Sequence, residues 1–251
     1  MTAPAQARPA IANRGTARRL LVTRRDPESR LYEPVGFLSV DDGLYRFRYL
    51  RAALASDTFR PLPGLPVGRG SLEDVRLFPL FAERIMSPRR SDRPTVLEAL
   101  GLGLDAEPFE VLARSGGRRV GDTIELVPAP DLGTDGSITL DFFVHCVRYM
   151  TPRAQERITG LTEDETLRLV PDPDNAADCR AVLVTDQDAV RLGYVPGPLL
   201  GLVHDMSSQE VRVLRANGPS VGFHFRLLVR LTGSMPVGAR PFAGPEWETA
   251  D

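Results

Sequence analysis

The stretch LRLVPDPDNAAD (residues 167–178) decides how the second half of this chain is interpreted. Its first residues are typical of a strand, and the Pro, Asp and Asn residues that follow predict a turn, because Asp and Asn side chains hydrogen-bond to their own backbone. Two short strand-like runs come next, AVLVT (181–185) and VRLGYV (190–195). This order of strand, polar turn and two further strands is typical of a small antiparallel sheet.

Further strands are predicted on both sides of this stretch, over residues 138–149, 210–215 and 221–231. One short helix is expected among them, from Pro198 to Met206. Six short strands separated by turns, with a single helix, predict a small β-barrel or a strongly bent sheet over residues 138–233.

The first half of the chain combines strands with short helices. Strict alternation in LYRFRY (44–49), which follows the turn residues DDG (41–43), predicts a β-hairpin with residues 35–40. The other elements predicted here are a strand at 20–23, helices within 71–85 and at 94–102, and a second hairpin over 109–128 around SGG (115–117). The chain is therefore predicted to be α+β and mainly antiparallel β.

These elements divide the chain into consecutive parts. We predict a flexible tail at residues 1–18, a small α+β domain at 19–105, a linking hairpin at 106–137, the strand-rich domain at 138–233 and a C-terminal tail at 234–251. The boundary is placed at DLGTDG (131–136), because its Asp and Gly residues favour a connection between domains.

The composition argues against several kinds of catalysis. All 31 basic residues are arginine, so the lysine that P-loop enzymes, protein kinases and Schiff-base enzymes need in their usual form is missing. The spacing of cysteine and histidine does not match a metal site, since neither CxxC nor HxxxH occurs. We therefore expect no enzyme activity, no metal and no cofactor.

Charge and hydropathy limit the partners. The net charge of −2 provides no broad basic field, so any contact with nucleic acid must be local and geometric. No apolar run is long enough to span a membrane, and a membrane partner is not expected. The two cysteines, Cys146 and Cys179, are too few for a disulfide scaffold, which favours the cytoplasm.

Three segments of the second half together resemble the HIRAN domain: residues 147–149, 167–178 and 181–196, in that order and spacing. This family occurs at the front of fork-remodelling helicases and alone in bacteria. The resemblance implies an OB-like β-barrel that grips the 3′-hydroxyl end of single-stranded DNA. It also implies a bacterial protein with a role in DNA repair or genome maintenance.

The resemblance implies roles for five residues. Arg148 would contact the DNA backbone and Tyr149 would stack on the terminal base, while Asn175 and Asp178 lie on the loop that meets the terminal sugar. Tyr194 falls where the family has a polar or aromatic contact. The sequence departs from the family at two places. Ala177 replaces an aromatic residue that would close the other side of the base, and Val195, Pro196 and Gly197 stand where a lysine would reach phosphate.

Residues 19–105 resemble the N-terminal subdomain of HipA-type toxin kinases. The resemblance is carried by VGFL (35–38), YRFRY (45–49), LPGLP (62–66) and LFPLFA (77–82), without the motifs of the kinase body. It implies an interaction or regulatory domain that could bind a protein partner.

Two functions are compatible with these features. The first is a nucleic-acid-binding module for single-stranded DNA or DNA 3′ ends, in an accessory or regulatory role. The alternative is a protein–protein interaction component of a toxin–antitoxin-like or defence assembly. The site residues also have structural interpretations: Arg148 and Tyr149 as an exposed pair at a sheet edge, residues 172–175 as an ordinary turn, and Tyr194 as core packing.

Overall fold

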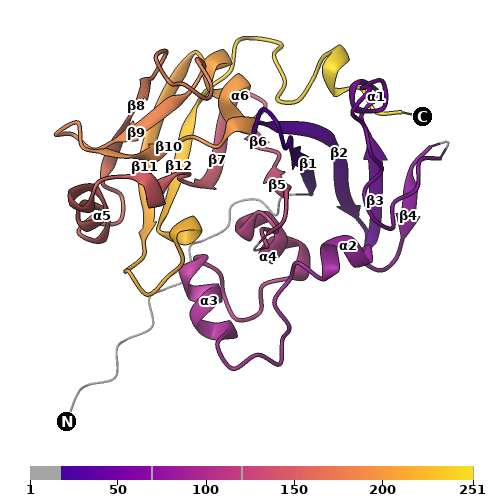
Figure 1. The fold of residues 1–251 in the computed structure, drawn as a ribbon, viewed down its shortest axis with the longest axis horizontal. Coiled ribbons are helices and arrows are strands. Elements are labelled where there is room, and N and C mark those ends of the chain that lie inside the picture. Colours follow the sequence, from indigo (N-terminus) through magenta and orange to yellow (C-terminus); the bar gives the residue numbers. More distant parts are fainter. Residues whose placement is uncertain (1–17, 69, 120, 251) are drawn as a thin grey trace.

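The computed structural model describes residues 18–68, 70–119 and 121–250, and within them the strands form two antiparallel sheets that lie side by side (Figure 1). The N-terminal sheet has the order β4-β3-β2-β1-β5. Its strands are β1 (Arg19–Arg25), β2 (Tyr32–Asp41), β3 (Leu44–Tyr49), β4 (Leu72–Asp74) and β5 (Ile124–Pro128). The predicted hairpin is confirmed as β2 and β3, whereas the tail predicted at 1–18 lies outside the described residues except for Arg18.

The second sheet has the order β10-β9-β8-β11-β12-β7-β6. Its strands are β6 (Asp131–Leu132), β7 (Ser137–Phe143), β8 (Thr166–Pro171), β9 (Val182–Thr185), β10 (Arg191–Tyr194), β11 (Ser208–Ala216) and β12 (Leu227–Ser234). An isolated bridge joins β10 to the segment after β7, through paired backbone hydrogen bonds of 2.8 and 3.0 Å between His145 and Tyr194. The sheet is mainly antiparallel, as predicted, but this contact is a bridge and not the continuous ladder of a closed barrel.

Short helices connect the strands. The α-helices are α1 (Arg51–Leu54), α2 (Pro79–Ala82), α3 (Arg93–Ala99), α4 (Pro108–Ser115), α5 (Pro152–Thr159) and α6 (Leu200–Asp205). The 3₁₀ turns are η1 (Val147–Tyr149), η2 (Gly197–Leu199), η3 (Phe223–Phe225) and η4 (Pro245–Trp247). The helix predicted from Pro198 to Met206 is confirmed as η2 and α6.

The hairpin predicted over 109–128 is wrong in its first half. Helix α4 starts at Pro108 and is followed by Gly116 in the left-handed conformation (φ 66°), a common end for a helix. Its buried residues Phe109 and Leu112 are three apart and so lie on one helix face. Strand β5 then pairs with β1, so residues 106–137 are not a linking hairpin.

Other local predictions also need correction. Residues 72–74 form β4 against β3 where a helix was expected from residue 71. The strand predicted over 138–149 ends at Phe143, because Cys146 adopts a left-handed conformation (φ 62°) and η1 follows. Helix α5, which sequence reasoning missed, begins at Pro152 and is capped by the Thr151 hydroxyl.

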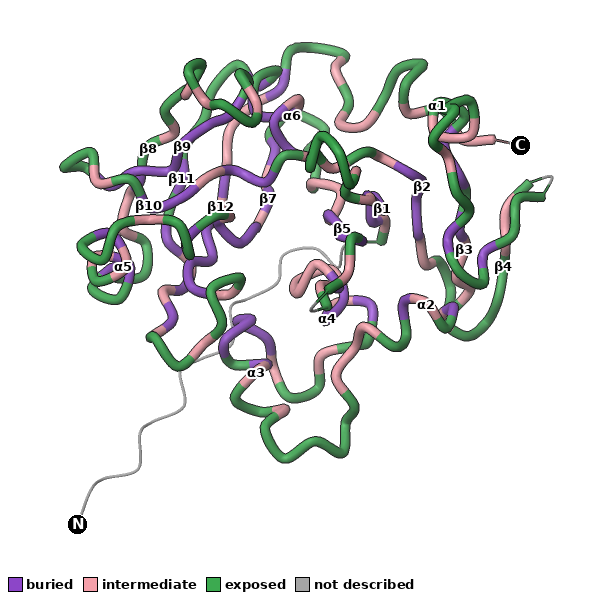
Figure 2. Tube along the Cα trace, in the orientation of Figure 1, coloured by how far each residue is buried: buried purple, intermediate pink, exposed green. Residues whose placement is uncertain are grey.

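One buried hydrophobic cluster contains residues of both sheets. Leu21, Phe37 and Val127 of the N-terminal sheet belong to the same buried cluster as Leu140 and Val229 of the second sheet, and Figure 2 shows buried strands in both. A second buried cluster, which includes Val22 and Phe47, lies entirely within the N-terminal half, so only part of that sheet's apolar surface faces the second sheet.

The predicted C-terminal tail is also packed. In Figure 1 it crosses from β12 to α1, and Thr249 forms a bridge with Leu50. The rings of Phe242 and Trp247 lie 6.1 and 6.2 Å from the ring of Phe37. Residues 234–251 therefore link the two halves, as far as the described chain extends.

Candidate nucleic-acid interface

The loop between β8 and β9 is held by a network centred on Asp172. The Tyr194 hydroxyl donates to Asp172 Oδ2 at 2.8 Å, and Asn175 Nδ2 donates to the same oxygen at 3.2 Å. These hydrogen bonds lower the pKa of Asp172, while burial and the Asp172 charge raise the pKa of Tyr194. Two of the five predicted residues, Asn175 and Tyr194, thus use polar groups to shape the loop.

Asp178 lies at the other end of this loop. Its backbone N–H donates to Asn175 Oδ1 at 3.3 Å, as does that of Ala177 at 3.0 Å. Its own Oδ1 accepts the backbone N–H of Arg180 at 2.8 Å, and its side chain is partly exposed. The loop therefore presents the Asp178 carboxylate from a backbone that local hydrogen bonds fix.

Arg148 and Tyr149 lie on η1 beside β10. Both are exposed, and Tyr149 has an exposed fraction of 80%. The turn contacts β10 and η3, and the bridge between His145 and Tyr194 fixes the chain just before it. The structure thus brings η1 and Tyr194 together at the end of the sheet where β8 ends and β9 begins.

Sequence reasoning missed an aromatic residue next to this turn. Phe223 on η3 has an exposed fraction of 39%, and η3 contacts η1. Its neighbour Phe225 instead packs edge-on against Phe143, with ring centroids 5.2 Å apart. The sequence GFHF (222–225) carries this signal, but it falls within the strand predicted over 221–231, whose first part is the 3₁₀ turn η3 in the structure.

Residues 137–199 match the family model of the HIRAN domain. This part of the chain is a HIRAN domain. The match indicates a DNA-binding module, and it includes all five residues predicted for the site. Phe223 and the whole N-terminal sheet lie outside it.

Two solved structures are similar to part of the chain. One is the HIRAN domain of human HLTF, with 20% identity, a TM-score of 0.29, and coverage of 42% of this chain and 84% of that one. The other is a protein from Lactobacillus plantarum, with 18% identity, a TM-score of 0.33, and coverage of 40% and 97%. No curated protein matches the chain. The HIRAN match does not extend to residues 19–105, whose resemblance to HipA stays a prediction.

A buried polar junction joins the HIRAN domain to the N-terminal sheet. Glu125 on β5 has a side chain only 5% exposed, and it accepts hydrogen bonds from Arg118 Nε at 3.1 Å and Nη2 at 2.7 Å. His145 Nε2 lies 3.0 Å from Glu125 Oε1, and Arg118 Nη1 lies 3.0 Å from His224 Nδ1. Burial alone would raise the pKa of Glu125, but the charges of His145 and Arg118 hold it at about 2.

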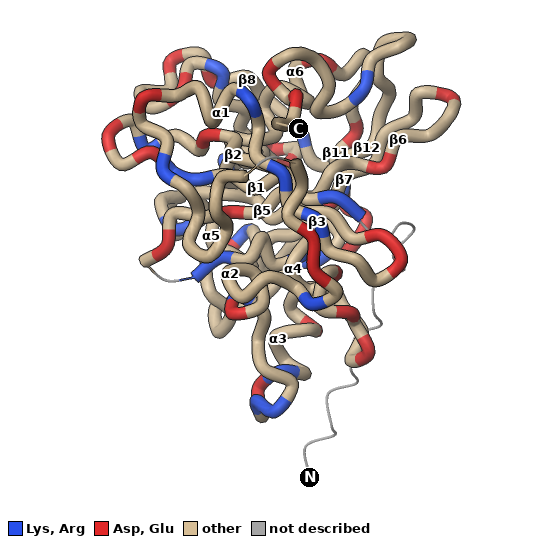
Figure 3. The backbone as a smooth tube through the Cα atoms, turned by 90° about the vertical axis from the view of Figure 1, so that its right-hand side faces the viewer, with Lys and Arg blue, Asp and Glu red and all other residues tan. Residues whose placement is uncertain are grey.

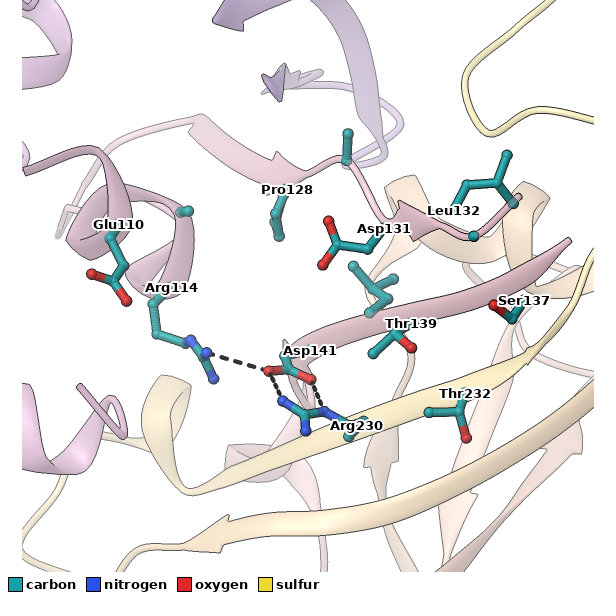
Figure 4. A pocket seen from close by; sticks show the side chains of 14 residues that line it. Glu110, Arg114, Pro128, Asp131, Leu132, Ser137, Thr139, Asp141, Arg230 and Thr232 are labelled. Carbon is teal, nitrogen blue, oxygen red and sulfur yellow. Dashed lines mark hydrogen bonds and ion pairs between the residues drawn. The ribbon is translucent and has the colours of Figure 1, made fainter. Parts of the chain in front are cut away.

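A separate cavity of about 590 Å³ lies between α4 and strands β6, β7 and β12 of the second sheet (Figure 4). On its wall Arg230 pairs with both oxygens of Asp141, at 2.7 and 2.8 Å, and Arg114 reaches the same carboxylate at 3.3 Å. Burial and the charge of Asp141 raise the pKa of Asp131 on the opposite wall. Since its acids outnumber its two arginines, which both contact Asp141, this cavity does not favour phosphate.

Charges of both signs are distributed over the described chain, and Figure 3 shows no long basic run. In the same residues, no group of three or more His, Cys, Asp or Glu side chains is placed to hold a metal ion. No helix of the described chain has the length and apolar character needed to cross a membrane.

Proposed function

We propose that the HIRAN domain of this chain holds the 3′ end of a single DNA strand, as an accessory or regulatory protein without turnover of its own. The binding surface is η1, η3 and the loop of residues 171–178. The observation that carries the proposal is the exposure of Tyr149, because a large aromatic side chain left in solvent offers a stacking face for a base.

The residue types at this surface suit the end of a strand. Tyr149 supplies one stacking face, and Phe223 on the adjacent turn supplies the aromatic face that Ala177 cannot. Arg148 pairs with a phosphate, which its guanidinium can contact through two hydrogen bonds. The Asp178 carboxylate accepts a hydrogen bond from a free 3′-hydroxyl and repels a 3′-phosphate.

Replacing Tyr149 with alanine is expected to weaken binding of a short single-stranded oligonucleotide by about 1–3 kcal/mol, since it removes a stacking face. Fluorescence anisotropy measures the change. The matched control is Tyr149→Phe, which keeps the ring and should keep the affinity. Equal affinity of the wild type and Tyr149→Ala for every oligonucleotide would reject the DNA proposal and favour the protein-partner alternative.

Replacing Asp178 with asparagine is expected to remove the preference for a 3′-hydroxyl over a 3′-phosphate, with little change in total affinity. The asparagine Oδ1 can still accept the Arg180 N–H, so the loop should keep its shape. The comparison uses matched oligonucleotides with either end, and a circular one. Asp188→Asn makes the same charge change in the exposed turn between β9 and β10 and should leave the preference intact. A preference that survives in Asp178→Asn would contradict this role.

A further inference from the structure

The second half of the chain, from β7 onward, receives contacts from the N-terminal half at two points close to the proposed surface, one in the HIRAN domain and one on η3. His145 lies just before η1, which carries Arg148 and Tyr149. His224 lies on η3, directly after Phe223. These two histidines come from separate parts of the sequence, and Arg118 contacts both, through Nη2 at 3.1 Å from His145 Nε2 and through Nη1 at 3.0 Å from His224 Nδ1.

Arg118 is itself held by the N-terminal sheet. Glu125 on β5 binds it through two hydrogen bonds, and the side chains of Arg118 and Glu125 are 20% and 5% exposed. The orientation of the guanidinium is thus set by a buried carboxylate, so its contacts with the histidines have fixed geometry. Glu125 also contacts His145 directly at 3.0 Å.

His145 is at the same time part of the HIRAN sheet. Its backbone forms the bridge with Tyr194, whose hydroxyl holds the loop through Asp172. A movement of the His145 side chain would therefore be transmitted to η1 on one side and to the β10 strand on the other. Arg148 is close enough to His224 for its charge to help lower the pKa of that histidine, after burial, Arg118 and His145.

We propose that Arg118 and Glu125 are positioning residues, through which the N-terminal half sets the relative placement of η1 and η3 and so the DNA affinity of the HIRAN domain. This inference rests on the proposed function. It assigns a role to the N-terminal half of the chain, which lies outside the HIRAN match. The N-terminal sheet would then act as an extension of the binding site, without contacting DNA through these two side chains.

The test is the double variant Arg118→Met/Glu125→Gln in the full chain. Removing both charges together avoids leaving one buried charge without its partner, which is the strongly destabilising change. The matched control is Arg84→Met/Asp122→Asn, which removes another ion pair with a buried arginine from the same half. The hydrogen bonds of these two side chains in the described chain go to Leu80, to Ile124 and to each other, so they stay within the N-terminal half. We expect the first variant to lose about 5- to 10-fold in affinity for a 3′-hydroxyl oligonucleotide, a typical coupling between sites, and the control to bind like the wild type.

A second readout separates positioning from a general loss of stability. The backbone amide NMR shifts of η1 and η3 should change in Arg118→Met/Glu125→Gln and stay constant in the control, even where both variants lose similar thermal stability. If the first variant fails to fold, His224→Ala at the exposed end of the junction should still lower the affinity, by a smaller factor. If Arg118→Met/Glu125→Gln and His224→Ala both bind with wild-type affinity, the positioning role is overturned and the proposed DNA function stands. If the wild type binds none of the oligonucleotides, both proposals fall.

Discussion

Acidification from pH 6 to pH 2 is expected to remove about 3 kcal/mol from the free energy of unfolding through Glu125 alone. The pKa of this buried carboxyl is about 2 in the folded chain, against an ordinary value of 4.5, and one pKa unit corresponds to about 1.4 kcal/mol. Because the folded-state pKa is the lower one, the stabilisation is complete above pH 5. It is lost as the unfolded chain takes up a proton between pH 5 and pH 2.

Urea denaturation at several pH values measures this effect, with Glu125→Gln as the comparison. At pH 6 the variant should be less stable by about 3 kcal/mol or more, because Arg118 stays buried without its carboxylate partner. Its stability should then fall less steeply than that of the wild type between pH 5 and pH 2, so the two curves should converge. Parallel curves over this range would show that Glu125 is not the titrating group.

The variant Gly193→Ala is expected to destabilise the chain by about 2–4 kcal/mol, through backbone strain and overpacking together. Gly193 has φ 148°, a conformation that other residues rarely adopt. A Cβ atom there would lie 2.4 Å from the carbonyl oxygen of His145 and 2.5 Å from Val144 Cγ1. Strand β10 would have to move away, which breaks the bridge between His145 and Tyr194.

Chemical denaturation of Gly193→Ala gives the loss of stability, and anisotropy below the unfolding transition gives the loss of DNA binding. The stability and the DNA affinity should both decrease, because the broken bridge lies between η1 and the loop held by Tyr194. Gly197→Ala is the control, since a Cβ at Gly197 would meet no atom within 4 Å. Its stability should stay within about 0.5 kcal/mol of the wild type, as for ordinary surface changes. Unchanged binding by folded Gly193→Ala would mean that the bridge does not order the surface.

Local patterns were sufficient for most strands of the fold. The alternation in residues 44–49, together with the turn at 41–43 that precedes them, predicted the hairpin of β2 and β3. The runs at 181–185 and 190–195 predicted β9 and β10. Helix α4 was missed because its sequence, PFEVLARS, is short and is followed by two glycines that also suit a hairpin turn. Pro108 at its start and Gly116 at its end were the better guides.

The candidate site was only partly predictable for a physical reason. The five residues lie in one HIRAN domain, and the local turn around Asn175 could be inferred from its sequence. The pairing of Tyr194 with Asp172 joins strand β10 to the loop between β8 and β9, and that of Arg118 with His224 joins residues 106 positions apart. Such contacts follow from the folded arrangement of the sheets, and no short sequence pattern contains them.

The cluster shared by the two sheets limits which fragments of this chain can fold and which segments recombination can transfer to another gene. The HIRAN match ends at residue 199, yet β7 pairs with β12 and β8 pairs with β11, both of which come later in the chain. A fragment of residues 137–199 would leave these edges open, and one extended to residue 235 would still lose the cover that Leu21, Phe37 and Val127 provide. We expect the fragment of residues 137–199 not to fold alone, and the longer fragment to be less stable than the whole chain. Recombination that moved this domain to another gene would have to carry β11 and β12 with it.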